Sequence, residues 1–120
     1  MDPRWLRHLG LVLAGAGIVV GVIGALALGR NLTPATTPVD DGRLIQSGIY
    51  ARVRHPIYTG VILVVAGYTL WWTNWRDALL VGWLMMLYFG AKSGAEERKL
   101  LAQFPEYDNY RRRVPRFFPF

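Results

Sequence analysis

Apolar residues are gathered into three runs along the chain, separated by polar and proline-containing segments. The first run, from Leu9 to Leu28, has no charged residue over about 20 positions, the length that spans the hydrocarbon core of a bilayer as a helix. Two shorter uncharged runs extend from Ile57 to Trp72 and from Ala78 to Ala91. The pattern predicts one domain, residues 1–120, with three transmembrane helices at about residues 9–29, 57–73 and 77–92.

The first apolar run could be a transmembrane helix or a secretory signal peptide, and one face of it is lined by small residues. A secretory signal peptide is disfavoured, because the run is long and is followed by GRNLTPATTP rather than a small-residue cleavage site. Small residues recur along the run at steps of three and four, which lets another helix approach closely. They are Gly10, Ala14, Gly17, Gly21 and Ala25. This face fits packing within the chain or a homodimer, and the sequence leaves both open.

Prolines set the expected limits of the later elements. Pro56 suits the first turn of a helix, and His55 before it is kept out of helical geometry, so the second helix is expected to begin there. The third helix is expected to run without a break from Asp77 to Phe104, stopping before Pro105. The tail after Pro105 combines tyrosines, arginines and phenylalanines, which is typical of a short helix lying on a membrane surface.

The lysines and arginines predict the orientation of the chain. The short turn TNWRD joins the second and third runs, so the segment before Pro56 and the C-terminal tail lie on one side. That side carries all of the 14 Lys and Arg residues except Arg4, Arg7 and Arg76. The positive-inside rule then puts the N-terminus outside and the tail in the cytoplasm, in an inner or plasma membrane. The predicted fold is an all-α integral membrane protein with three transmembrane helices and a cytoplasmic amphipathic C-terminal extension.

Composition narrows the possible chemistry. The absence of cysteine excludes disulfides, thiolate nucleophiles and cysteine-ligated metals. With His8 and His55 as the two histidines, no metal site is expected. The net charge of +6 comes from residues that flank apolar runs, so membrane topology explains it and no nucleic-acid partner is expected. Membrane lipids and a lipophilic substrate are the expected partners, with a homodimer through the first helix as a further possibility.

Three polar motifs meet at the cytoplasmic face of the predicted hairpin. They are RVRHPIYTG (residues 52–60), the acidic pair Glu96-Glu97, and YDNYRRR (residues 107–113). Successive helical residues point about 100° apart, so only one of the two glutamates can face the interior. The arginines could instead bind anionic headgroups, and His55 could simply flank the helix. The residues alone predict a polar pocket of mixed charge at this face, and no more.

The ordered combination of these motifs resembles a known superfamily. SGIYARVRHPIYTG, then a helical hairpin, then EERKLLAQFPEYDNYRRRVPRFFP is similar to the C-terminal half of the isoprenylcysteine carboxyl methyltransferase and phospholipid methyltransferase superfamily. The resemblance covers about residues 29–120 and implies a membrane enzyme that transfers the methyl group of S-adenosylmethionine. The sequence departs from the family at Ile49, where the pattern usually has proline between Gly48 and Tyr50. Relatives generally carry more N-terminal membrane helices, so a homodimer could complete the substrate tunnel.

The resemblance also implies roles for individual residues, in segments 43–58 and 93–120. The cofactor site would be lined by Gly48, Tyr50, Arg54, His55, Pro56 and Tyr58, and closed by Glu96 or Glu97 with the tail arginines and the tail tyrosines Tyr107 and Tyr110. A carboxylate acceptor would be oriented by Arg98 or Arg113, whereas an amine acceptor would give its proton to Glu97.

Two other functions fit parts of the pattern. Membrane sterol reductases, which use a nicotinamide cofactor, have a similar RHPxYxG-like stretch and a VPxxxxP ending. A non-catalytic membrane module that binds anionic lipid would keep the same fold. The acidic pair favours the methyltransferase.

Overall fold

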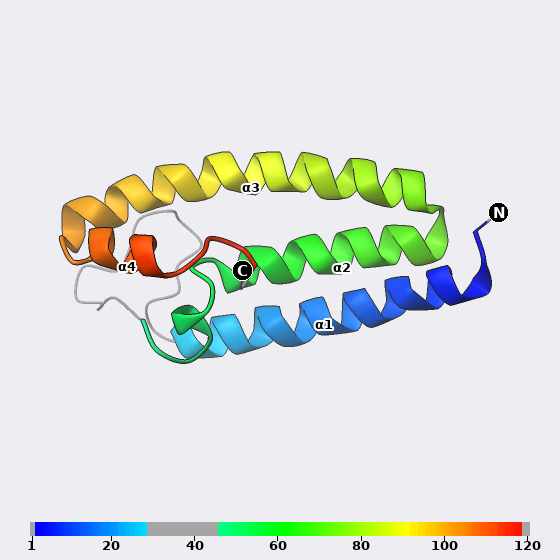
Figure 1. The fold of residues 1–120 in the computed structure, drawn as a ribbon, viewed down its shortest axis with the longest axis horizontal. Coiled ribbons are helices and arrows are strands. Elements are labelled where there is room, and N and C mark those ends of the chain that lie inside the picture. The colour runs from blue at the N-terminus through cyan, green and yellow to red at the C-terminus, as the bar shows by residue number, and fades with distance from the viewer. Residues whose placement is uncertain (1, 29–45, 119–120) are drawn as a thin grey trace.

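The computed structural model describes residues 2–28 and 46–118, and the regular secondary structure in this part of the chain is helical (Figure 1). Residues 43–45 and 119–120 of the predicted cofactor segments lie outside the described residues. Three long helices lie side by side along the long axis of a molecule measuring 50 × 26 × 23 Å. The elements are α1 (Arg4–Leu28), the 3₁₀-helix η2 (Gly48–Ala51), α2 (Pro56–Trp72), α3 (Trp75–Gln103) and α4 (Tyr107–Arg113).

The helix limits follow from the residues at their ends. Pro56 is the first residue of α2, as expected. Asn74 caps α3, because its Oδ1 accepts the backbone N–H of Asp77 at 2.9 Å. The C-cap of α3 is Phe104, which adopts an extended conformation directly before Pro105. The prediction of one long third helix is therefore confirmed, with each end within two residues of the expected position.

Glycines hold α1 and α2 together. Gly10, Gly17 and Gly24 are buried, and each faces α2. A Cβ atom on Gly17 would lie 2.6 Å from the carbonyl oxygen of Gly60, so the two backbones are in direct contact there. The small-residue face of the first helix is thus used for packing within the chain. A homodimer through α1 remains a prediction, and these contacts do not support it.

Residues near the N-terminus form hydrogen bonds with the turn that joins α2 to α3. The Nε of Arg7 donates to the carbonyl oxygen of Trp71 at 3.0 Å, close to the end of α2. The backbone N–H of Trp75 donates to Oδ2 of Asp2 at 2.7 Å, at the start of α3. Both helix ends that meet in the turn therefore receive a polar partner from the first residues of the chain, Asp2 just before α1 and Arg7 in its first turn.

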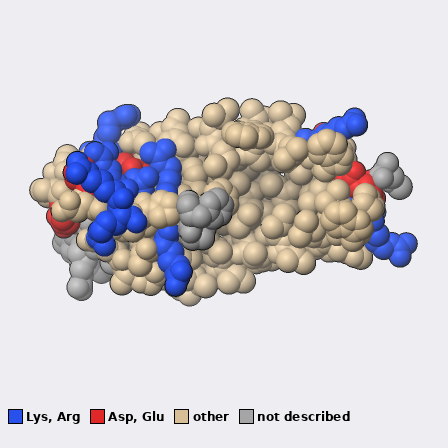
Figure 2. Space-filling model, in the orientation of Figure 1, with Lys and Arg blue, Asp and Glu red and all other residues tan. Residues whose placement is uncertain are grey.

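The helices present their apolar side chains outward. In the most apolar 18-residue windows of α1 and α3, the buried share is 11% in each case. A soluble core helix would bury most of such a window, so these side chains face lipid. Charged side chains gather at the two ends of the long axis and leave the middle free of them on the face seen in Figure 2. The protein is accordingly an integral membrane protein.

The expectation of three spans is confirmed for two helices. Among the described residues, α1 and α3 are long and apolar enough to cross a membrane. With 17 residues, α2 is apolar but shorter than the roughly 20 residues that a perpendicular span needs.

The C-terminal tail folds back onto the start of α2. The backbone N–H groups of Arg54 and His55 donate to the carbonyl oxygens of Pro115 and Arg116, at 2.9 and 3.0 Å. Thr59 Oγ1 donates to the carbonyl oxygen of Phe117 at 2.6 Å. The ring of Phe117 is buried with the side chains of Ile62 and Phe89 in a small apolar cluster. The tail thereby covers one side of the polar end of the bundle.

Candidate functional site

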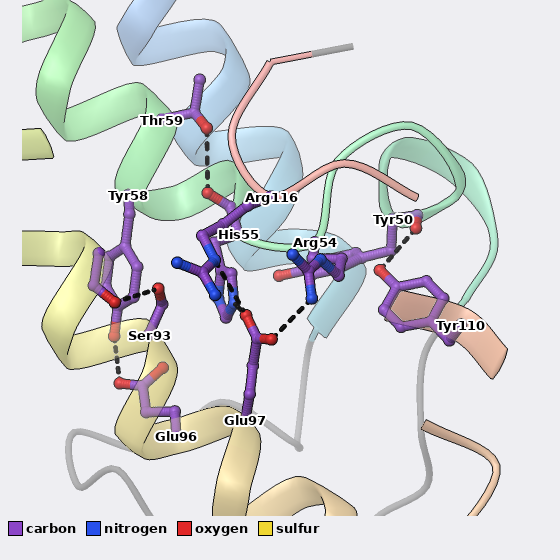
Figure 3. A network of polar contacts seen from close by, with 11 residues as sticks. Tyr50, Arg54, His55, Tyr58, Thr59, Ser93, Glu96, Glu97, Tyr110 and Arg116 are labelled. Atoms are coloured by element: carbon purple, nitrogen blue, oxygen red, sulfur yellow. Dashed lines mark hydrogen bonds and ion pairs between the residues drawn. The ribbon is translucent and has the colours of Figure 1, made fainter. Parts of the chain in front are cut away.

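Polar side chains from five segments meet at one end of the molecule (Figure 3). The segments are η2, the turn before α2, the first turn of α2, the polar C-terminal part of α3 and the tail from α4 onward. The side chains drawn there include Tyr50, Arg54, His55, Tyr58, Thr59, Ser93, Glu96, Glu97, Tyr110 and Arg116.

Glu97 lies at the centre of this network. It is 4% exposed, and its two carboxylate oxygens contact three cationic or potentially cationic side chains. Arg54 Nη1 donates to Oε1 at 2.6 Å, and His55 Nε2 lies 2.7 Å from Oε2. Arg116 Nε lies 3.4 Å from Oε2. Charge-assisted contacts of this kind fix both the carboxylate and its partners in place.

The surroundings of Glu97 keep it ionised. The residue lies beyond Lys92, in the polar part of α3 that follows the apolar part. Burial by itself raises the pKa of this carboxyl, but the hydrogen bond with His55 and the attraction of His55, Arg54 and Arg116 outweigh it and lower the pKa. An ionised carboxylate already held by these partners is a poor proton acceptor. In the network it pairs with Arg54, His55 and Arg116.

This lowered pKa predicts acid sensitivity. Because folding lowers the pKa of Glu97, its contribution to stability is present above the unfolded-state pKa of about 4.3 and is lost as the pH falls through the lower folded-state value. We expect the thermal unfolding midpoint of the wild type to fall as the pH decreases below about 5. The Glu97→Gln variant, measured in the same detergent, should show a flatter profile. Parallel profiles for the two proteins would contradict this expectation.

Glu96 belongs to a second polar group. It accepts a short hydrogen bond from the Tyr58 hydroxyl, and Lys92 Nζ lies 3.3 Å from the same oxygen, Oε1. The imidazole of His55 stacks on the Tyr58 ring at 5.6 Å between centroids, and Tyr58 stacks on Phe89 at 4.6 Å. The two neighbouring glutamates thus point to different partners, as their helical spacing requires. The interior glutamate is Glu97, and it is also the one that meets the arginines.

Two tyrosines brace the other side of the network. The Tyr50 hydroxyl donates to the carbonyl oxygen of Gly24 at 3.2 Å, and the Tyr110 hydroxyl donates to the carbonyl oxygen of Tyr50 at 2.6 Å. Burial raises the pKa of Tyr50 to about 12, so its hydroxyl stays a donor. Gly48, which begins η2, has a φ of 63°, a conformation that glycine adopts without steric cost.

Apart from Gly48, at the exposed start of η2, the predicted site residues divide into three groups. Arg54, His55, Tyr58, Glu96 and Glu97 lie together in the network. Buried beside it, in supporting positions, are Tyr50, Pro56, Tyr107 and Tyr110.

Arg98 and Arg113 take no part in these contacts within the described residues. Arg98 is exposed, and Arg113 donates to Gln46 at 2.9 Å. Their predicted role in orienting an acceptor remains a prediction. Arg116 and Thr59 were not predicted individually as site residues, although Thr59 lies in the RVRHPIYTG motif and Arg116 lies in the tail segment that ends in VPRFFP.

The arginines around Glu97 retain unused hydrogen-bonding capacity. Within the described part of the chain, the buried Nε atoms of Arg54 and Arg116 have no hydrogen-bond acceptor. The 3.4 Å contact of Arg116 with Glu97 is close enough for electrostatic attraction but lacks the geometry of a hydrogen bond. Buried N–H groups without an acceptor are costly, and such groups in a polar site can bind a ligand anion.

Comparison with known proteins identifies the family. The sequence profile of the phospholipid methyltransferase family matches residues 5–106, which is most of the chain. The chain belongs to the phospholipid methyltransferase family. The match ends before the tail, so Tyr107, Tyr110 and Arg116 lie beyond it.

The curated relatives include a metal-resistance protein and isoprenylcysteine methyltransferases. The chain is 28% identical over 118 residues to the cobalt-zinc-cadmium resistance protein CzcN of Cupriavidus metallidurans, covering 98% of this chain and 53% of that protein. It is 34% identical over 80 residues to the protein-S-isoprenylcysteine O-methyltransferase of Schizosaccharomyces pombe, covering 66% of this chain and 34% of that protein. The chain therefore spans about half of the first relative and a third of the second.

A solved structure shares the fold. The eukaryotic intramembrane Ras methyltransferase ICMT, isoprenylcysteine carboxyl methyltransferase, superposes with a TM-score of 0.84 at 27% identity. The superposition covers 98% of this chain and 43% of that one. This likeness supports the membrane fold and the resemblance noted in the sequence. It extends over the tail as well as the helices.

Proposed function

We propose that this protein is an S-adenosylmethionine-dependent methyltransferase that acts on a lipophilic acceptor at the membrane surface. The observation that carries the proposal is the buried Glu97, contacted by Arg54, His55 and Arg116 at the polar end of lipid-facing helices. Membership of the family and the likeness to the intramembrane methyltransferase support it.

The residues present fit the polar part of this cofactor. Its carboxylate would accept from the unused Nε groups of Arg54 and Arg116, and its ammonium would pair with Glu96. Tyr58, whose hydroxyl bonds Glu96, would lie beside the same ammonium. When bound, the cofactor supplies a methyl group activated by the positive sulfur. The protein's part is then to hold donor and acceptor in line and to keep water out, for which no metal is required.

The acceptor that fits best is a carboxylate. A carboxylate arrives ionised and needs no base, whereas an amine must lose a proton. Glu97 is a poor base because it stays ionised and paired. Arg98 and Arg113 are exposed cations at the same end of the molecule and could attract an anionic acceptor. An acceptor of the prenylcysteine type, with an apolar tail in lipid and a carboxylate at the surface, has this chemistry.

The same proposal includes the placement of the chain in the membrane. All three long helices would cross the bilayer, and α2 would span it packed against α1 and α3. The site would face the cytoplasm and the N-terminus the outside, as the distribution of arginines favours. The cofactor would enter from water, and the acceptor from lipid.

Calorimetry on the purified protein tests the function. We expect S-adenosylhomocysteine to bind and reduced nicotinamide cofactors not to bind. Binding of the reduced nicotinamide alone would replace this proposal with a reductase of the sterol-reductase type. Binding of neither cofactor would leave a non-catalytic lipid-binding module. Repeating the titration on protein reconstituted in lipid controls for disturbance of the site by detergent.

A further inference from the structure

Lys92, Glu96 and Tyr58 form a compact group beside the Glu97 network. Lys92 Nζ is 3.3 Å from Glu96 Oε1 and 5.8 Å from the centroid of the Tyr58 ring. The Tyr58 hydroxyl donates to that same Glu96 oxygen. The side chain of Glu96 is 16% exposed and that of Lys92 is 29% exposed. An aromatic face and a largely buried carboxylate thus enclose one primary ammonium group.

This group has the composition of a site for a ligand cation. A carboxylate supplies charge and hydrogen-bond acceptors, and a tyrosine ring within about 6 Å adds a cation–π attraction. The ammonium of Lys92 is chemically the same as the ammonium of an amino acid. The Lys92 side chain that now fills the site is more exposed than Glu96, so it can leave without unfolding the helix.

We propose that Lys92 holds the place of a ligand ammonium, and that the amino-acid ammonium of the cofactor displaces it from Glu96 and Tyr58. This inference rests on the function proposed above and adds an internal competitor to the cofactor site. Lys92 neutralises Glu96 while the site is empty, because an unpaired carboxylate beside the membrane interior is costly. The same contact must be broken when the cofactor binds, so Lys92 weakens binding and speeds product release.

A simpler role for Lys92 leads to a different result. If Lys92 only orients Glu96 by their four-residue helical spacing, its removal weakens ligand binding or leaves it unchanged. Displacement predicts the opposite sign. Without Lys92 the empty protein loses stability, yet the ligand binds more tightly, since no ammonium has to be expelled. The combination of lower stability and higher affinity therefore identifies a placeholder.

The experiment is calorimetric titration of Lys92→Met with two ligands. One is S-adenosylhomocysteine, and the other is the analogue with hydrogen in place of its α-amino group. We expect S-adenosylhomocysteine to bind Lys92→Met about tenfold more tightly than wild type, within the usual range of coupling between sites. We expect the deaminated analogue to gain no affinity. The thermal unfolding midpoint of the empty variant should fall.

Two controls separate the possible outcomes. Arg112→Gln removes a surface cation whose side chain is 72% exposed, and it should change neither affinity nor unfolding midpoint. Lys92→Arg keeps the charge and should behave more like wild type. Weaker or unchanged binding of S-adenosylhomocysteine to Lys92→Met, or an equal gain for both ligands, would overturn the placeholder role. Failure of the wild type itself to bind S-adenosylhomocysteine would instead reject the proposed function.

Discussion

Replacing Glu97 by alanine is expected to cause the largest loss of function. The substitution leaves Arg54 and His55 without the buried carboxylate that holds them, at 2.6 and 2.7 Å. Breaking a buried ion pair by removing one partner costs roughly 3 kcal/mol or more. We expect the free energy of unfolding in detergent to fall by about this amount, and methyl transfer to fall at least about 100-fold as the site loses its alignment.

Matched variants distinguish alignment from loss of folding. Glu97→Gln keeps the shape of the side chain but removes its charge, so its unfolding free energy should lie between those of wild type and Glu97→Ala. Arg112→Gln, which disrupts an exposed pair with Asp108, should behave like wild type in both measurements. A Glu97→Ala protein that binds S-adenosylhomocysteine as well as wild type would show that the carboxylate does not organise the site.

Replacing Gly17 by alanine is expected to give a large loss of stability through helix packing alone. The new Cβ would lie 2.6 Å from the carbonyl oxygen of Gly60 and 2.8 Å from the backbone nitrogen of Val64. Both neighbours are backbone atoms of α2, so only a separation of the two helices can relieve the clash. Overpacking of this kind costs about 1–3 kcal/mol, and we expect the upper end of that range. Denaturant or thermal unfolding in mild detergent measures it.

Gly15 provides the control on the same helix. A Cβ there meets no atom within 4 Å among the described residues, so Gly15→Ala should be neutral or slightly stabilising. Gly21→Leu tests the predicted homodimer through the same helix. A Cβ added at Gly21 would meet its nearest neighbour at 3.8 Å, which is an ordinary contact, so a change in dimerisation would not arise from a Cβ clash with α2. Equal losses for Gly15→Ala and Gly17→Ala would point to a general effect of glycine replacement in α1 rather than to contact with α2.

Local signals in the sequence were enough to predict most helices. The apolar runs, Pro56 and Pro105 are features of single segments, and they predicted where α2 begins and where α3 ends. They also predicted that two adjacent glutamates must point in different directions, because helical geometry alone requires it. The motifs predicted most of the network in the same way, since they named Arg54, His55 and both glutamates.

Other features depend on contacts between distant segments. The sequence offered no reason to choose Glu97 over Glu96 as the buried carboxylate, nor to add Arg116, which is brought to Glu97 by the folded-back tail. It also left Arg98 and Arg113 as candidates, because exposure cannot be read from residue type.

The sequence by itself determined that this is a helical membrane protein with polar motifs at one end of its apolar helices, because hydrophobic length and helix breakers act within one segment. The tertiary structure decided which carboxylate is enclosed and which cations face it. It also decided that the glycines of α1 pack against α2. These outcomes depend on spatial contacts between residues that are far apart in the sequence, such as His55 and Glu97, which are 42 positions apart. Such distances are fixed only when the helices pack.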